Sequence, residues 1–189
     1  KPHPMKSRFF FTLFIFLFSQ QGFTQITSRE KMAKQIFTVF HDNDLPAFIR
    51  LFPDAANTRI FMKDIMKQQS GSDSILPEMQ DFLNDITDST LQVEYKVDYE
   101  EFREKGTDKG VDWANTVYVS YVSDSSLNAE TNYPQLTGKI YFKSGNTDYF
   151  MAFSEVMWFR EKGWYGLFIN RVDRKENEHK VIEEKDELQ

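Results

Sequence analysis

The stretch LTGKIYFKSGNTDYFMAFSEVMWFR, residues 136–160, decides the fold class. Apolar and aromatic side chains recur at every second position on both sides of the segment 144–147, and that spacing is the spacing of a β-strand. Gly145-Asn146 at the centre of the break is typical of a tight hairpin turn. We therefore predict two antiparallel strands, 136–143 and 148–160, that pair through this turn.

Two further strands flank this hairpin. Residues 116–122 (TVYVSYV) are rich in β-branched and aromatic side chains and precede it. Residues 164–172 follow it after the short break Glu161-Lys162-Gly163. The last third of the chain therefore predicts an antiparallel sheet of about four strands.

The first half of the chain has the spacing of helices. Apolar residues recur at intervals of three and four from Ser28 to Phe40, and Ser28 is a suitable N-cap. We expect three more helices, one capped by Asp44 with Pro46 in its first turn, one capped by Asp54, and one that begins near Pro77. The polar run from Ser70 to Ser74 predicts a loop between the last two.

The segment 91–109 has two interpretations. Apolar and polar residues alternate from Leu91 to Tyr99, which favours a strand. Leu91, Tyr95, Tyr99 and Phe102 also form a helical stripe, and the charged run 100–105 favours a helix. Periodicity therefore leaves 91–99 open between strand and helix and predicts a helix for 100–109.

These elements predict an α+β protein in which N-terminal helices pack on a curved C-terminal antiparallel sheet. The length of 189 residues suits a single domain, which we place at 26–173. Residues 174–189 are mostly charged, so we expect them to form a tail outside the fold.

The first 25 residues have the pattern of a secretory signal peptide. Lys6 and Arg8 precede an apolar run at 9–18, and a polar segment follows it. A leader that stays in the membrane is the alternative, and residues 1–4 stand upstream of Met5. Because an exported chain without cysteine suits a bacterial periplasm or exterior, we expect a secreted or periplasmic bacterial protein.

Composition excludes several classes of function. A formal charge of −6 and a pI near 5.2 disfavour nucleic acid as a partner. A mean hydropathy of −0.55 excludes a protein with several membrane spans, so we expect no membrane partner after cleavage of the leader. The chain has no cysteine and no phosphate-binding glycine loop. We predict no cofactor and no metal, and interpret the segment 41–44 (HDND) as helix caps and a turn.

A resemblance to a known class enters at residues 102–113 (FREKGTDKGVDW), 142–145 (FKSG) with Tyr149, and 163–165 (GWY). These segments are similar to those of small exported, uncharacterised proteins of Gram-negative bacteria. Those proteins resemble the cystatin-like α+β class, whose widest branch is nuclear-transport-factor-two-like. The resemblance implies helices packed into the concave face of a curved sheet, and a helix at 91–109. It implies no activity.

Glu155 breaks the pattern of its strand. Strict alternation from Tyr149 to Phe159 places this carboxylate on one face among large apolar side chains. A two-residue turn at Lys162-Gly163 would pair Glu155 with Asn170, Phe153 with Val172 and Met157 with Phe168. We therefore propose Glu155, Asn170, Phe153, Met157 and Phe168 as a ligand pocket, with Glu155 as the candidate catalytic residue. A register slip, a bulge that turns Glu155 outward, or a position at the open rim are the structural alternatives.

The opposite face of the predicted sheet is also apolar. Tyr141, Phe150, Trp158, Tyr165 and Ile169 would share it. A partner could cover such a face, so we expect a homodimer through the sheet as one arrangement.

Three functions follow from these features. The first is a non-catalytic binding module for a small apolar ligand on the concave face, or for a protein partner on the open face. The alternative is an isomerase- or hydrolase-type enzyme that uses Glu155 as its general base. The third is a structural protein whose concave face is filled by its own side chains.

Overall fold

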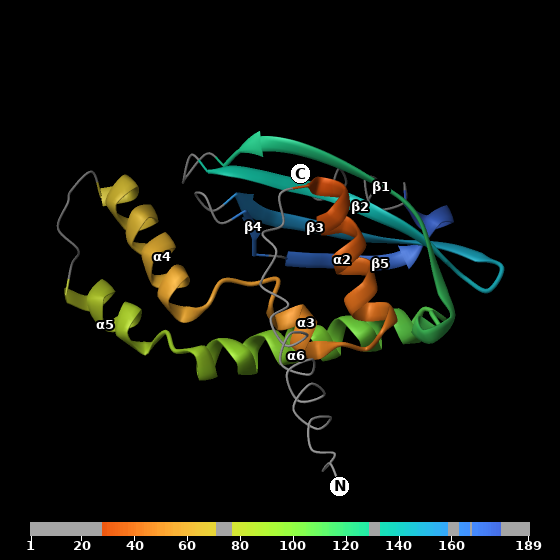
Figure 1. Ribbon diagram of the computed structural model, residues 1–189, viewed down its shortest axis with the longest axis horizontal. Coiled ribbons are helices and arrows are strands. Elements are labelled where there is room, and N and C mark those ends of the chain that lie inside the picture. Colours follow the sequence, from red (N-terminus) through yellow and green to blue (C-terminus); the bar gives the residue numbers. More distant parts are fainter. Residues whose placement is uncertain (1–27, 71–76, 129–132, 159–162, 167, 179–189) are drawn as a thin grey trace, which may run out of the picture.

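The computed structural model describes residues 28–70, 77–128, 133–158, 163–166 and 168–178, and Figure 1 shows their arrangement. The protein is α+β, with an open sheet of five antiparallel strands. The strands are β1 (Thr116–Leu127), β2 (Pro134–Ser144), β3 (Thr147–Trp158), β4 (Trp164–Tyr165) and β5 (Phe168–Arg174). β1, β2 and β3 are neighbours in that order, and both β4 and β5 pair with β3.

The helices begin where their capping residues predict. α2 (Arg29–His41) follows Ser28, whose hydroxyl accepts a hydrogen bond from the backbone N–H of Lys31. α3 (Leu45–Ile49) follows Asp44, and α4 (Ala55–Ser70) follows Asp54, each with the carboxylate bonded to a first-turn N–H. α5 (Pro77–Asp85) begins at its proline. These four starts are confirmed.

The segment 91–108 is a helix throughout, and Lys109 is its C-cap. α6 (Asp88–Asp108) starts with a capping box between Thr87 and Thr90. Tyr99, Phe102 and Gly106 are buried along one side of α6, whereas Val93 and Val97 are exposed. The alternation that favours a strand is therefore misleading, because its valines face solvent and the helical stripe faces the protein.

The segment after Phe102 turns the chain from α6 into the sheet. Gly106 lies against the Trp113 indole so closely that a Cβ at this position would collide with the ring. Gly110 has a φ of +90°, a conformation that glycine adopts readily at a helix end. Trp113 is buried, donates its indole N–H to the carbonyl of Arg103 at 3.0 Å and stacks on Phe142. Gly106, Gly110 and Trp113, which belong to the segment 102–113 that carries the resemblance, therefore have structural roles: they end α6 and pack the chain against the core.

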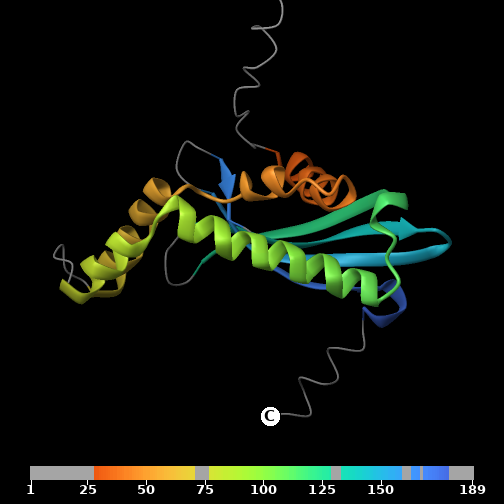
Figure 2. The same cartoon turned by 90° about the horizontal axis from the view of Figure 1, so that it is seen from below.

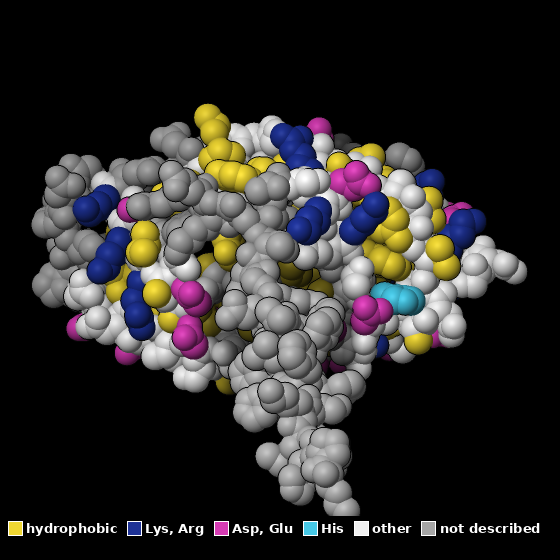
Figure 3. Space-filling model, viewed as in Figure 1, with side chains coloured by type: hydrophobic (Ala, Val, Ile, Leu, Met, Phe, Trp, Pro, Cys, Tyr) yellow, Lys and Arg dark blue, Asp and Glu magenta, His cyan; other side chains and the backbone are white. Residues whose placement is uncertain are grey.

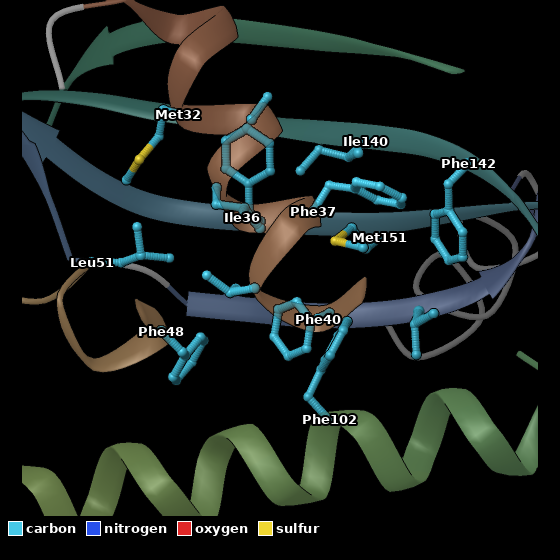
Figure 4. Packing of buried hydrophobic residues seen from close by; sticks show 14 of the residues in the cluster. Met32, Ile36, Phe37, Phe40, Phe48, Leu51, Phe102, Ile140, Phe142 and Met151 are labelled. Atoms are coloured by element: carbon cyan, nitrogen blue, oxygen red, sulfur yellow. The ribbon is translucent and has the colours of Figure 1, made fainter. Parts of the chain in front are cut away.

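The main core lies between α2 and the sheet. Ile36, Phe40 and Met151 are completely excluded from solvent, and Figure 4 shows α2 side chains projecting toward those of the strands. α6 runs along the β5 side of the sheet in both views (Figures 1 and 2), with α3 between it and α2. Tyr99 ties α6 to α2 through a hydrogen bond from its hydroxyl to the carbonyl of Val39 at 3.1 Å.

α4 and α5 form an arm with a small core of its own. Ala55, Met66, Leu83 and Ile86 are buried together, separately from the main core. The Tyr133 hydroxyl donates to Asp64 of α4 at 2.7 Å, which joins the arm to the start of β2. In Figure 1 this arm extends to the left of the sheet.

The register of the β2–β3 hairpin agrees with the prediction from the turn as far as the Gly138–Phe153 pair and shifts beyond it. Ser144 pairs with Thr147 across Gly145-Asn146, as expected. Farther along, Gly138 pairs with Phe153 but Leu136 pairs with Val156, so β3 holds one extra residue. Glu155 lies in this bulge with a φ of +57°.

Several predictions fall outside the described residues. The leader at 1–25, the loop residues 71–74, most of the break at 161–163 and the tail beyond 178 belong to this group. Residues 174–178, which we expect to be tail, instead continue β5 and form a 3-10 turn, η3 (Lys175–Asn177). Among the described residues, no helix has the length and apolar character needed to cross a membrane.

Candidate functional site

The structure contradicts the placement of Glu155 on the buried face of the sheet. The bulge reverses the alternation of β3, so that Val156 is buried and Glu155 is exposed to solvent. An exposed carboxylate lacks the desolvation on which its proposed catalytic role rests. The outward-turning bulge is the alternative that the structure supports.

The predicted pairing between β3 and the last strand is also wrong. Phe153 pairs with Ile169, Ser154 with Phe168 and Met157 with Tyr165. Asn170 is an extra residue of β5, because Arg171 and Ile169 pair with consecutive residues of β3. Each of the two strands therefore holds a bulge, and the register shifts by two to three residues from the one predicted for a regular hairpin.

These shifts separate the five predicted pocket residues. Phe153 is buried in the main core, and Met157 is half-buried beside β4. Phe168 and Asn170 are exposed on β5. The sheet face on which we expect a ligand is occupied by Met32, Ile36, Phe37 and Phe40 of α2 (Figure 4).

A groove of about 370 Å³ lies instead between α6 and β5. Its walls come from elements that are distant in the sequence but adjacent in the fold. Phe48 of α3 and Phe52 of the following turn close one side. The residues that complete the lining are Asp98, Glu101, Phe102 and Lys105 of α6, Lys109 at its end, and residues 168–172 of β5.

Helical spacing places the α6 residues in the groove. Positions 98, 101, 102, 105 and 109 follow the three- and four-residue intervals of one helix face. On the other wall, Asn170 is the bulged residue of β5, and its side-chain oxygen accepts a hydrogen bond from Ser154 at 3.2 Å. The bulge thus brings Phe168, Ile169 and Asn170 to the lining of the same groove.

One part of the groove is aromatic. Phe48 and Phe52 lie 5.0 Å apart between ring centroids, and Phe52 stacks on Tyr95 of α6 at 4.0 Å. Burial raises the pKa of Tyr95 to about 12, with the neighbouring Glu94 adding to the effect. Phe168 completes the aromatic lining, yet 56% of it remains exposed. A large aromatic side chain is thus uncovered beside rings that are packed.

The charged residues of the groove are paired, with one exception. Lys105 lies 3.3 Å from Glu101, and Lys109 lies 3.1 Å from Asp173 at the far end. Within the described part of the chain, Asp98 forms no hydrogen bond or ion pair. Burial raises the pKa of Asp98 above its ordinary value, and repulsion from Glu101 adds to this effect.

Asp173 is the most strongly held carboxylate near the groove. It is only 7% exposed, and burial alone would raise its pKa. Hydrogen bonds from Arg171 at 2.9 Å, from Asn177 at 3.0 Å and from the backbone N–H of Arg174 at 2.8 Å outweigh this burial. Together with Lys109 they hold the pKa of Asp173 well below its usual range. This network fixes residues 174–177 against β5.

The face predicted to mediate a homodimer is partly covered by the chain itself. Phe150 is 1% exposed and lies between Lys139 and Arg171, whose cationic groups are 5.5 and 5.1 Å from its ring. Glu178 accepts hydrogen bonds from Lys139 and from the hydroxyl of Tyr141. Trp158 packs edge-on against Trp164, and Ile169 and Trp158 both border the main core. Tyr165 is half-buried in β4.

The segment His41-Asp42-Asn43-Asp44 connects two helices, as predicted. His41 bonds to Thr116 at 3.0 Å, Asn43 accepts from Tyr99 at 3.2 Å, and Asp44 caps α3. No group of three or more potential metal ligands occurs among the residues that the structure describes.

On the visible, non-grey part of the face in Figure 3, basic and acidic side chains are interspersed.

Sequence reasoning missed the α6 side of the groove. Asp98, Glu101, Lys105 and Lys109 look like an ordinary solvated helix face, and only their position opposite β5 distinguishes them. Phe168 belongs to the predicted pocket, but the prediction paired it with Met157, whereas it pairs with Ser154.

Comparison with known protein families, curated proteins and solved structures found no match to this chain.

Proposed function

We propose that this protein is a non-catalytic binding module that holds a small ligand with an apolar part in the groove between α6 and β5. The observation that carries the proposal is Phe168, an aromatic side chain left 56% exposed in a groove of about 370 Å³. That volume falls within the range of known ligand sites, which are largely apolar with a few polar groups.

The arrangement of the groove supports binding. Phe52 offers ring surface to an apolar group and is held by Phe48, which is only 2% exposed, and by Tyr95 of α6. Because these rings are held in place before a ligand arrives, little conformational entropy is lost on binding. Glu155, the residue of the enzymatic alternative, is exposed and does not line the groove. Among the described residues, no hydrogen bond or ion pair of Glu155 supports an isomerase- or hydrolase-type activity.

The finer fold assignment and the location are parts of the same proposal. Helices that cover one face of an open antiparallel sheet, and a long helix at 88–108, are features expected of a cystatin-like or nuclear-transport-factor-two-like protein. The basic start and apolar run at 6–18 support export to the periplasm or the exterior. An exported binding module of this class is therefore the function that we propose.

The experiment is a calorimetric titration of the full chain with 1-octanol, a probe with an apolar chain and one polar end. We expect saturable binding that Phe168→Ala weakens at least about fivefold, the effect of losing roughly 1 kcal/mol of apolar contact. Phe82→Ala is the matched control, because Phe82 is 52% exposed but lies on α5, outside the groove.

Equal binding by the wild type and Phe168→Ala would contradict the proposed groove. So would the absence of saturable binding up to the solubility limit of the alcohol. Thermal unfolding of both variants shows whether the fold is retained, and we expect changes within about 0.5 kcal/mol because both side chains are exposed.

A further inference from the structure

Asp98 is the charge of the groove that the protein leaves unpaired. Glu101 is paired with Lys105, and Asp173 is paired with Lys109 and Arg171. Among the described residues, no cation lies within ion-pair distance of Asp98. Asp98 is exposed, so solvent and the more distant charge of Lys105 act on its carboxylate, and a bound cation would be its first direct partner.

The basic residues that line the groove are already engaged. The guanidinium of Arg171 bonds to Asp173 and to the carbonyl of Asn177, and it lies 5.1 Å from the ring of Phe150. Lys105 and Lys109 each contact a carboxylate. An anionic ligand would have to displace one of these contacts, whereas a cationic ligand would add a partner for Asp98 without breaking any.

The aromatic residues that share the groove with Asp98 also favour a cation. Phe48, Phe52 and Phe168 line it together with this carboxylate. The electron-rich faces of aromatic rings attract ammonium groups, and desolvation strengthens the attraction. Burial and repulsion from Glu101 raise the pKa of Asp98, while Lys105 opposes them, and a bound cation would act in the same direction as Lys105. The formal charge of −6 on the chain adds a general attraction for cations.

We propose that the groove between α6 and β5 selects organic cations, with an alkylammonium group between Asp98 and the exposed aromatic lining and an apolar part against Phe52 and Phe168. This inference rests on the proposed function, because it names the ligand class of the same groove. It adds a specificity-determining residue, Asp98, to the apolar contact of Phe168.

The experiment compares three probes that share one apolar chain and differ in charge. The full chain is titrated with octyltrimethylammonium, 1-octanol and octanesulfonate, each below the concentration at which it forms micelles. We expect the cation to bind about tenfold more tightly than the alcohol, as one cation–π contact and one partly screened ion pair together would give. We expect the sulfonate to bind most weakly.

Asp98→Asn isolates the carboxylate. We expect this variant to bind the cation about three- to fivefold more weakly than the wild type, because it loses the ion pair but keeps the cation–π contact, and to leave the affinity for the alcohol unchanged. Asp108→Asn is the matched control, because Asp108 is an exposed acid of α6 outside the groove. It removes the same net charge, and we expect it to change cation binding less than twofold at 0.15 M salt, where distant charges are screened.

The outcomes separate this inference from the function on which it rests. If 1-octanol binds and Phe168→Ala weakens it, but the cation has no advantage or Asp98→Asn does not reduce that advantage, the cation selectivity is wrong and the binding function stands. If Asp98→Asn and Asp108→Asn weaken the cation equally, the attraction is general and the role of Asp98 is overturned. If none of the three probes binds saturably, both proposals fail.

Discussion

The interior beneath α2 and the groove beside α6 are both lined with aromatic side chains, but only the interior is filled. Phe40 is 0% exposed between α2, α6 and the sheet, whereas Phe168 of the groove is 56% exposed. Phe48 and Phe102 belong to both regions, so the floor of the groove is the outer side of the core. The protein fills the covered face of its sheet with its own helix and leaves space at the β5 edge.

The difference follows from the two helices. α2 places Met32, Ile36, Phe37 and Phe40 against the strands at helical spacing, and such side chains pack to high density. The α6 face that borders β5 carries Asp98, Glu101 and Lys105. Because charged groups lose hydration on burial, these residues keep α6 and β5 from closing on each other. The groove is therefore a consequence of charge on one wall.

The largest expected effect comes from removing a ring from each region. Phe40→Ala should destabilise the fold by about 3–5 kcal/mol, since it deletes a fully buried aromatic side chain and leaves a cavity. Phe168→Ala should change the free energy of unfolding by less than about 0.5 kcal/mol. Urea denaturation of the two variants measures both values. Similar losses in both would contradict the distinction between a filled and an open region.

Gly106→Ala tests how tightly the core closes where α6 meets Trp113. In an exposed helix this change would stabilise by about 0.5–1 kcal/mol. Here the added methyl group collides with the indole, so we expect a loss of about 1–3 kcal/mol. Asp108→Ala, two residues along the same helix and exposed, is the control and should stay within about 0.5 kcal/mol. A stabilising Gly106→Ala would show that the contact is loose.

Acid should loosen the segment 174–177 at the end of the groove. The folded-state pKa of Asp173 lies below its unfolded value of about 3.9, so its ionised form stabilises the fold above that pH. This stabilisation is lost as the pH falls from about 4 through the folded-state pKa, when protonation weakens the bonds from Arg171 and Lys109. Unfolding measured between pH 6 and pH 2 should show this loss in the wild type. Asp173→Asn should lack that contribution, and an unchanged pH dependence in the variant would refute the role of the network.

The smallest effect concerns the bulge that turns Glu155 outward. A residue other than glycine at a φ of +57° is strained by about 1 kcal/mol or more, and glycine relieves the strain at some entropic cost. We expect Glu155→Gly to stabilise by about 0.5 kcal/mol and Glu155→Ala, which keeps a Cβ, to give no such gain. Binding of 1-octanol should be the same in all three proteins, because Glu155 does not line the groove. A loss of binding in both variants would show that Glu155 contributes to ligand binding and would contradict its position outside the groove.

Local chemistry predicts the local structure well. Ser28, Asp44 and Asp54 mark three helix starts, and Gly145-Asn146 marks the hairpin. The sequence does not decide between strand and helix at 91–99 for a local reason. Val93 and Val97 produce the alternation typical of a strand, although both are exposed on a helix. In contrast, Glu155 occupies a bulge position where a glycine would have been a recognisable signal.

The site depends on longer-range features. Two bulges, at Glu155 and at Asn170, decide which β3 and β5 residues face the same way, and neither has a marker in the sequence. Asp98 and Phe168 are 70 positions apart, and periodicity within either element does not indicate that they meet. Two of the predicted pocket residues, Phe168 and Asn170, therefore line the groove, whereas the α6 wall opposite them was not predicted.

The most direct test is methyl NMR of the full chain during titration with 1-octanol. Ile169 and Val172 line the groove, whereas Ile36 of α2 and Ile140 of β2 are fully buried between α2 and the sheet. The account predicts saturable shifts of the Ile169 and Val172 methyl signals, with those of Ile36 and Ile140 nearly unchanged. Shifts confined to Ile36 and Ile140 would place the ligand between α2 and the sheet and would contradict the groove as the binding site.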